Sequence, residues 1–124
     1  MPGFKDWLRK ASGDLKLAMK SPGNDETLDS AIYLTHQCAE KSLKAFFVSK
    51  GMVIPRVHDL IVLLNHCVKL DKEFVLLQKA CISLDSYGIN ARYPNDAFRV
   101  NQNDLIVAID TAHQVLSFVS QKVL

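Results

Sequence analysis

Residues that interrupt helices are scarce in this chain of 124 residues, which has four prolines and five glycines. Proline and glycine are the two residues that most disfavour a helix interior, so their scarcity leaves room for long uninterrupted helices. No apolar run approaches the roughly 20 residues that are needed to cross a bilayer. The N-terminal segment also lacks the apolar centre of a signal peptide. We therefore expect a cytoplasmic protein without membrane-spanning segments.

Cysteines are also few, and their number is odd. Cys38, Cys67 and Cys81 show no C-x-x-C spacing, and each lies in an apolar helical context. An odd set without paired spacing favours reduced thiols over a disulfide framework or a zinc site. We therefore predict three reduced cysteines in the core of a cytosolic protein.

The chain also has no large excess of charge of one sign, and it lacks the common catalytic motifs. The formal net charge is +2, which gives no general case for nucleic acid. The G-x-S-x-G, G-x-x-x-x-G-K-[ST] and G-x-G-x-x-G motifs are absent, and so is H-E-x-x-H. His36 and Glu40 could place two ligands on one side of a helix, but no second motif completes a metal site. We predict neither a metal ion nor another cofactor.

Apolar residues recur at helical spacing in five segments, within a chain whose length suits a single domain spanning residues 1–124. The segments cover about residues 4–20, 24–50, 58–70, 71–87 and 103 onward. Gly51 suits the C-terminal turn of the second helix, and residues 52–57 form a connection. This pattern predicts an all-α protein folded as an up-and-down antiparallel bundle of about five helices.

The second helix carries an apolar stripe on one side and a polar row beside it. The stripe consists of Leu28, Ile32, Thr35, Ala39, Leu43 and Phe46. Glu40 precedes Lys44 by four residues, the favourable order for a helical ion pair, which is worth a few tenths of a kcal/mol. His36 lies four residues before Glu40. From the sequence, this polar row is a solvated face, a partner surface or a site.

Two further segments hold polar residues with more than one interpretation. His58 and Asp59 open the third helix, where they either cap its N-terminus or place His58 against His36 or Glu40 across the bundle. Residues 89–103 have few apolar side chains and form a predicted loop. In that loop Arg92 and Tyr93 offer a planar fork and a stacking surface to an anion; alternatively, Arg92 pairs with a helix carboxylate and pins the loop to the bundle.

The chain resembles the HEPN family (higher eukaryotes and prokaryotes nucleotide-binding domain) over essentially its whole length. The resemblance rests on three motifs in the same order: HQCAEKSLKAF from residue 36, HDL at 58–60, and ARYP at 91–94. It implies an all-α bundle that dimerises. It also implies a minimal nucleotidyltransferase as the partner, often in a toxin–antitoxin pair.

The family's best-known activity, metal-independent RNA cleavage, depends on an arginine followed after four to six residues by a histidine. No arginine of this chain has a histidine at that spacing. We therefore predict a non-catalytic, nucleotide-binding or nucleotidyltransferase-associated module. Two alternatives stay open: a ribonuclease toxin that uses a nonstandard arrangement of His58 and Arg92, and a purely structural interaction bundle.

The resemblance and the placement of charge together predict a set of nucleotide-binding residues. The lysines and Arg92 would contact phosphate, and His36 or Tyr93 would contact the base. The full set is His36, Gln37, Glu40, Lys41, Lys44, His58, Asp59, Arg92 and Tyr93.

Overall fold

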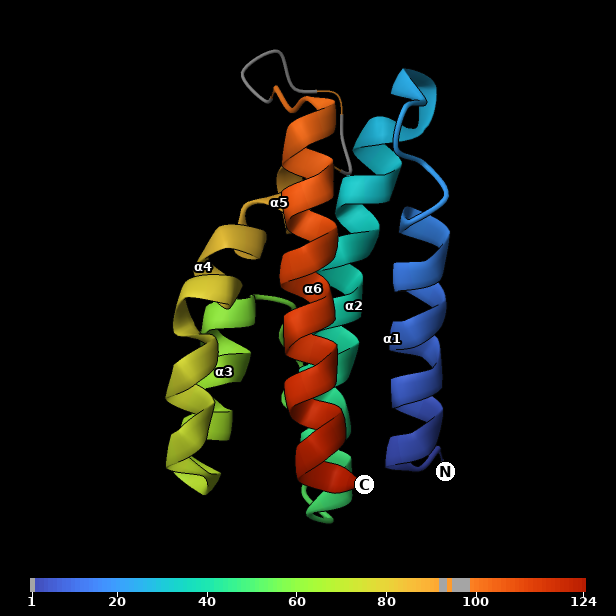
Figure 1. Cartoon of the computed structure of the whole chain (residues 1–124). Helices are drawn as coiled ribbons and strands as arrows, with labels where there is room; N and C mark the ends of the chain where they lie inside the picture. Colours follow the sequence, from blue (N-terminus) through green and yellow to red (C-terminus); the bar gives the residue numbers. More distant parts are fainter. Residues whose placement is uncertain (1, 92–93, 95–98) are drawn as a thin grey trace.

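A computed structural model describes residues 2–91, 94 and 99–124, and Arg92 and Tyr93 therefore lie outside the described residues. The described residues form helices and connections, with no strand among them. The long helices lie side by side along one axis, with α2 and α6 between α1 on one flank and α3 and α4 on the other (Figure 1). The elements are α1 (Phe4–Ala18), η1 (Asp25–Thr27), α2 (Leu28–Ser49), α3 (Leu60–Leu70), η2 (Lys72–Leu77), α4 (Gln78–Asp85), α5 (Tyr87–Asn90) and α6 (Gln102–Val123). The predicted all-α bundle of about five helices is confirmed.

The second helix begins four residues later than the sequence pattern suggested, at Leu28 instead of about residue 24. Asn24 accepts a hydrogen bond from the backbone amide of Glu26 at 3.0 Å, as an N-cap does. The capped turn is the 3₁₀-helix η1, and regular α-helix starts only at Leu28. Gln102 holds this turn in place, because its side chain accepts from the Gly23 amide and donates to Asp25, both at 2.8 Å.

Gly51 ends α2 in the left-handed conformation, with φ of 67°. The amide of Met52 donates to the Phe47 carbonyl and that of Gly51 to the Val48 carbonyl, which together form a Schellman motif. The segment between α2 and α3 runs back along α2, so that α3 starts beside the middle of α2 and runs in the same direction (Figure 1). Asp59 caps α3 by accepting from the amides of Ile61 and Val62 at 2.8 and 3.1 Å.

The last third of the chain differs from expectation in two details. The segment that Asp71 caps starts as the 3₁₀-helix η2 before it becomes α4. Residues 87–90 form the one-turn helix α5, where we predicted the helix to run out and a loop to begin. α5 packs against α2, and this contact supports a helical turn that the sequence pattern does not indicate.

The core is built around α2, which has fourteen buried residues. Phe74 lies between two helices, with its ring centroid 4.3 Å from that of Phe46 on α2 and 5.1 Å from that of Phe118 on α6. The prediction for the cysteines is confirmed: all three are free and buried, and burial raises the pKa of each thiol to about 12.

The polar row of α2 is buried with the apolar stripe. His36, Glu40 and Lys44 are 3%, 7% and 8% exposed. The row is therefore not a solvated face, and a buried charge requires a partner.

Within the described part of the chain, no helix is long and apolar enough to span a bilayer.

Candidate functional site

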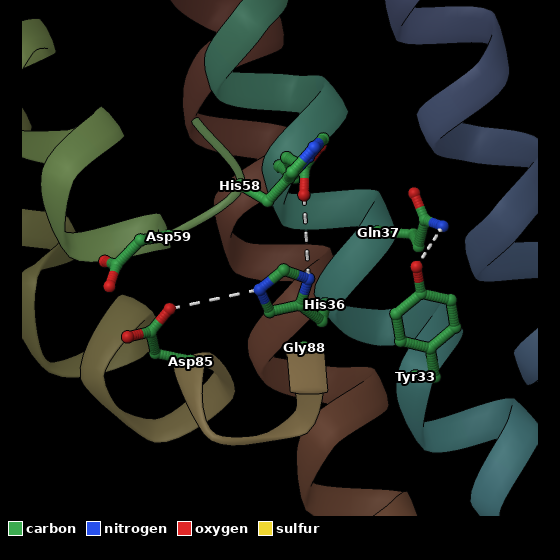
Figure 2. A pocket seen from close by; sticks show the side chains of 8 residues that line it. Tyr33, His36, Gln37, His58, Asp59, Asp85 and Gly88 are labelled. Carbon is green, nitrogen blue, oxygen red and sulfur yellow. Dashed lines mark hydrogen bonds and ion pairs between the residues drawn. The ribbon is translucent and has the colours of Figure 1, made fainter. Parts of the chain in front are cut away.

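A pocket of about 220 Å³ opens where the middle of α2 meets the start of α3 and the junction of α4 and α5. Figure 2 shows His36 at its centre, between Gly88 and His58. Four of the lining residues come from α2, and the others come from the two neighbouring segments. They are Tyr33, His36, Gln37, Glu40, His58, Asp59, Asp85 and Gly88.

The imidazole of His36 lies between two carboxylates without a direct hydrogen bond to either. Its Nδ1 is 3.9 Å from Glu40 Oε1, and its Nε2 is 3.9 Å from Asp85 Oδ1. These distances are too long for hydrogen bonds. Nδ1 is buried and has no hydrogen-bond partner within the described structure. An unsatisfied buried polar atom is costly, so this nitrogen marks a position where a ligand atom would be stabilising.

The environment of His36 favours its neutral form. Burial lowers the pKa of His36 below its usual 6.5, although the neighbouring carboxylates of Glu40 and Asp85 act in the opposite direction. At pH 7 the ring therefore carries one proton on one nitrogen, and the other nitrogen is an acceptor. The nearly parallel ring of Tyr33, 6.4 Å away between centroids and tilted by 8°, gives the pocket a second flat surface.

The lowered pKa of His36 predicts that acid destabilises the protein. As the pH falls below 6.5, this histidine is protonated in a larger fraction of the unfolded chains than of the folded chains. The free energy of unfolding should therefore fall as the pH decreases through 6.5, by at most about 1.4 kcal/mol per pH unit from this one group. The free energy of unfolding, measured with denaturant between pH 5 and 7, should depend less steeply on pH in His36→Gln than in the wild type. An equally steep pH dependence in the two proteins would contradict the lowered pKa of His36.

Glu40 lies within 4 Å of basic nitrogens on three side chains, those of His36, Lys44 and His58. Its Oε2 accepts a hydrogen bond from Lys44 Nζ at 2.8 Å and lies 3.0 Å from His58 Nδ1. Its Oε1 faces His36. The side chain of His58 is 77% exposed, so Glu40 orients an imidazole that is otherwise open to solvent. Of the two interpretations of the 58–59 pair, the structure shows both: Asp59 caps α3, and His58 faces Glu40.

The pocket is acidic. Glu40, Asp59 and Asp85 line it, whereas no lysine or arginine does so among the described residues. Two of these carboxylates also support the backbone: Asp59 caps α3, and Asp85 Oδ1 accepts from the Leu60 amide at 2.9 Å. With His36 neutral, the lining favours a hydrogen-bond donor or a cation over an anion.

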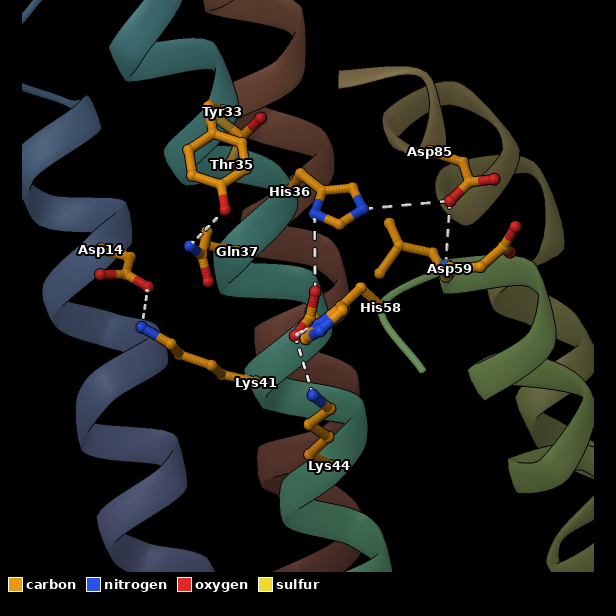
Figure 3. Close-up of polar contacts among 12 residues, drawn as sticks. Asp14, Tyr33, Thr35, His36, Gln37, Lys41, Lys44, His58, Asp59 and Asp85 are labelled. Atoms are coloured by element: carbon orange, nitrogen blue, oxygen red, sulfur yellow. Dashed lines mark hydrogen bonds and ion pairs between the residues drawn. The ribbon is translucent and has the colours of Figure 1, made fainter. Parts of the chain in front are cut away.

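The structure brings together five of the nine predicted site residues: His36, Gln37, Glu40, His58 and Asp59. Lys44 lies directly behind Glu40, to which it is paired. Lys41 points to the other side of α2, where it pairs with Asp14 of α1 at 2.7 Å (Figure 3). Both lysines therefore already have carboxylate partners and lie outside the lining. Arg92 and Tyr93 are outside the described residues.

Sequence reasoning missed three lining residues: Tyr33, Asp85 and Gly88. Tyr33 had a signal, because it precedes His36 by three residues and Gln37 by four; Gln37 Nε2 donates to its hydroxyl at 2.7 Å. Asp85 and Gly88 had none, because only the packing of α4 and α5 on α2 brings them to His36. The described residues include no group of three or more His, Cys, Asp or Glu side chains that could hold a metal ion.

Comparison with known proteins gives one family and two solved structures. The model of the HEPN domain matches residues 4–122. The chain is similar to the crystal structure of ST0689, an archaeal HEPN homologue, with 23% identity, a TM-score of 0.79 and full coverage of both chains. It is similar to TT1696 from Thermus thermophilus at 29% identity and a TM-score of 0.79, over 98% of this chain and 99% of that one. No curated protein matches the sequence.

Proposed function

The chain belongs to the HEPN domain family, and from this premise we propose that it is a non-catalytic nucleotide-binding module associated with a nucleotidyltransferase. The system would be of the toxin–antitoxin type. A second copy of the chain and a minimal nucleotidyltransferase are its proposed partners. The observation that supports nucleotide binding is the pocket around His36, whose ring nitrogen Nδ1 lacks a hydrogen-bond partner among the residues that the structure describes.

The size and chemistry of the pocket suit a part of a nucleotide. Its volume of about 220 Å³ is below the roughly 300–1,000 Å³ of pockets that enclose a drug-sized ligand. Two flat rings, Tyr33 and His36, lie beside carboxylate and amide groups that fix orientation by hydrogen bonds. The base fits this lining better than the phosphates, because carboxylates line the pocket and no lysine or arginine does so among the described residues.

The two lysines predicted to contact phosphate are each paired with a carboxylate. Lys41 and Lys44 would each have to leave a carboxylate to bind phosphate. Arg92 and Tyr93 remain proposed contacts on the ground of the sequence motif alone. A nucleotide bound in the pocket would therefore extend its phosphates away from the acidic lining, past the exposed His58.

A thermal-unfolding screen against nucleosides and nucleotides tests the proposal. A ligand at 100 times its dissociation constant should stabilise the protein by about 2.7 kcal/mol, seen as a rise of several degrees in Tm. His58→Ala should reduce the rise. His113→Ala is the matched control, because it removes an exposed imidazole from α6, away from the pocket. No rise with any nucleoside or nucleotide would overturn the proposal.

The contact between His58 and Glu40 favours one rival function. A carboxylate that orients an exposed imidazole is the arrangement of a general base, which a ribonuclease would need. The acidic lining argues against a bound phosphodiester. We expect the wild-type protein to leave RNA intact. Cleavage that is lost in His58→Ala and kept in His113→Ala would establish the ribonuclease and overturn the non-catalytic assignment.

A further inference from the structure

Two atoms in the pocket wall receive no hydrogen bond from the described residues and lie close enough to share one ligand group. They are Nδ1 of His36 and Oε1 of Glu40, 3.9 Å apart. Nδ1 has no partner, and none of the described residues donates to Oε1, because Lys44 and His58 both contact Oε2. One nitrogen can lie at hydrogen-bond distance from both atoms, since 3.9 Å is less than twice the usual bond length of about 2.9 Å.

The surroundings of His36 determine which of its nitrogens accepts. Asp85 faces Nε2, and its carboxylate also accepts from the uncharged Leu60 amide. Glu40 faces Nδ1, but its charge is already compensated by Lys44. The less compensated Asp85 therefore favours the proton on Nε2 and leaves a lone pair on Nδ1. The resulting pair of sites, Nδ1 and Oε1, consists of two acceptors.

Gly88 limits the space on the other side of the ring. The backbone of Gly88 approaches His36 so closely that an added Cβ would lie 2.6 Å from Nε2. His58, which contacts Glu40 Oε2, also lines the pocket, and its side chain is 77% exposed.

We propose that the pocket recognises the exocyclic amino group of a nucleobase, with one N–H donated to Glu40 Oε1 and the other to His36 Nδ1. This inference rests on the proposed function and narrows it to adenine, cytosine or guanine. An amino group supplies two donors on one nitrogen, which the two acceptors require. Uracil and hypoxanthine lack this group. A phosphate supplies only acceptors at neutral pH and meets the acidic lining.

Nucleoside pairs in which one member lacks the amino group test the inference on the wild-type protein. Calorimetry should compare adenosine with inosine, cytidine with uridine, and guanosine with inosine. At least one amino-bearing nucleoside should bind about ten-fold more tightly than its partner, the scale of a good two-bond base contact. Pyrophosphate should not displace it.

The histidine variants supply the second measurement. His36→Gln should reduce the preference for the amino-bearing member of the pair. His66→Gln should keep it, because His66 lies on α3 against Phe47 and does not line the pocket. Helical circular dichroism establishes whether each variant is folded. If His36→Gln does not fold, the nucleoside pairs still test the inference on the wild-type protein.

The possible failures are distinct. Equal affinity for the two members of every pair, or displacement by pyrophosphate, would overturn the amino-group inference and leave nucleotide binding standing. Binding of nucleotides without any binding of nucleosides would have the same meaning, because the phosphates would then supply the affinity. Absence of binding by every nucleoside and nucleotide would overturn the proposed function itself.

Discussion

Glu40→Gln should destabilise the protein by about 3 kcal/mol. The substitution keeps the size of the side chain but removes the negative charge next to Lys44 Nζ. The side chains of Glu40 and Lys44 are only 9% and 10% exposed, so the lysine would be left as a buried cation without a counter-charge. Breaking a buried pair from one side costs about 3–5 kcal/mol. We expect the lower end of that range, because the flexible stem of lysine lets the ammonium group move toward water.

Urea denaturation measures this cost, and a second substitution tests its cause. Lys44→Met in the Glu40→Gln background removes the unpaired cation, so the double variant should recover much of the lost stability. Arg9→Gln is the control: it removes the ion pair with Asp6, at 3.9 Å, in which both side chains are more than half exposed. An exposed pair contributes little, and the change should stay within about 0.5 kcal/mol.

A loss below about 1 kcal/mol in Glu40→Gln would contradict the buried-pair account. So would a double variant whose loss is simply the sum of the two single losses, because additive effects show that the two side chains do not interact. Equal losses in Glu40→Gln and Arg9→Gln would show that burial of the pair adds nothing to its value.

Glu40 and Lys44 also show what the sequence predicts and where prediction stops. Their four-residue spacing predicts an ion pair, and the pair exists. The same spacing suggests an exposed helix pair, worth a few tenths of a kcal/mol. Burial of α2 by helices on both flanks removes the pair from water and raises the cost of breaking it. Burial depends on tertiary packing, which helical periodicity does not encode.

The sequence patterns for helix ends and apolar stripes predicted local structure correctly, because they depend on residues that are neighbours in the chain. Gly51 ends α2 and Asp59 caps α3, as the sequence indicates. The apolar stripes place the helices to within a few residues. The exceptions are η1, where the helix starts late, and α5, whose turn depends on packing against α2.

Long-range proximity was only partly predictable for the site. His36 and Glu40 lie on one helix, and the contact of His58 with Glu40 was one of two open interpretations of the 58–59 pair. Asp85 enters the pocket from α4, which is distant from α2 in the sequence. Nothing in its local pattern distinguishes it from a surface carboxylate. The same packing that brings Asp85 to His36 also brings Gly88 there.

Gly88→Ala should be destabilising, although alanine is normally the better helix residue. A Cβ at this position would lie 2.6 Å from His36 Nε2 and 2.9 Å from Cε1. The His36 side chain is 4% exposed and lies between two carboxylates, so it has little room to move. Overpacking of this kind costs about 1–3 kcal/mol, which exceeds the gain of up to about 1 kcal/mol from replacing a helical glycine.

Gly13→Ala is the matched control for this prediction. Gly13 lies within α1, and an added Cβ would meet no atom of the described residues within 4 Å. This substitution should therefore stabilise the protein by about 0.5–1 kcal/mol, opposite in sign to Gly88→Ala. Urea denaturation of the two variants separates the intrinsic helix preference, which they share, from the steric contact, which only Gly88 has.

Shortening the histidine should relieve the effect of the added methyl group. In the His36→Asn background, Gly88→Ala should cost less than it does in the wild type, because the ring atoms that it would meet are gone. The difference between the two costs is the coupling energy of the pair, and for residues in contact it should reach about 1 kcal/mol or more. A zero coupling, or a Gly88→Ala protein as stable as Gly13→Ala, would show that Gly88 does not hold His36 in place. The pocket would then owe its shape to the two carboxylates rather than to the close approach of α5.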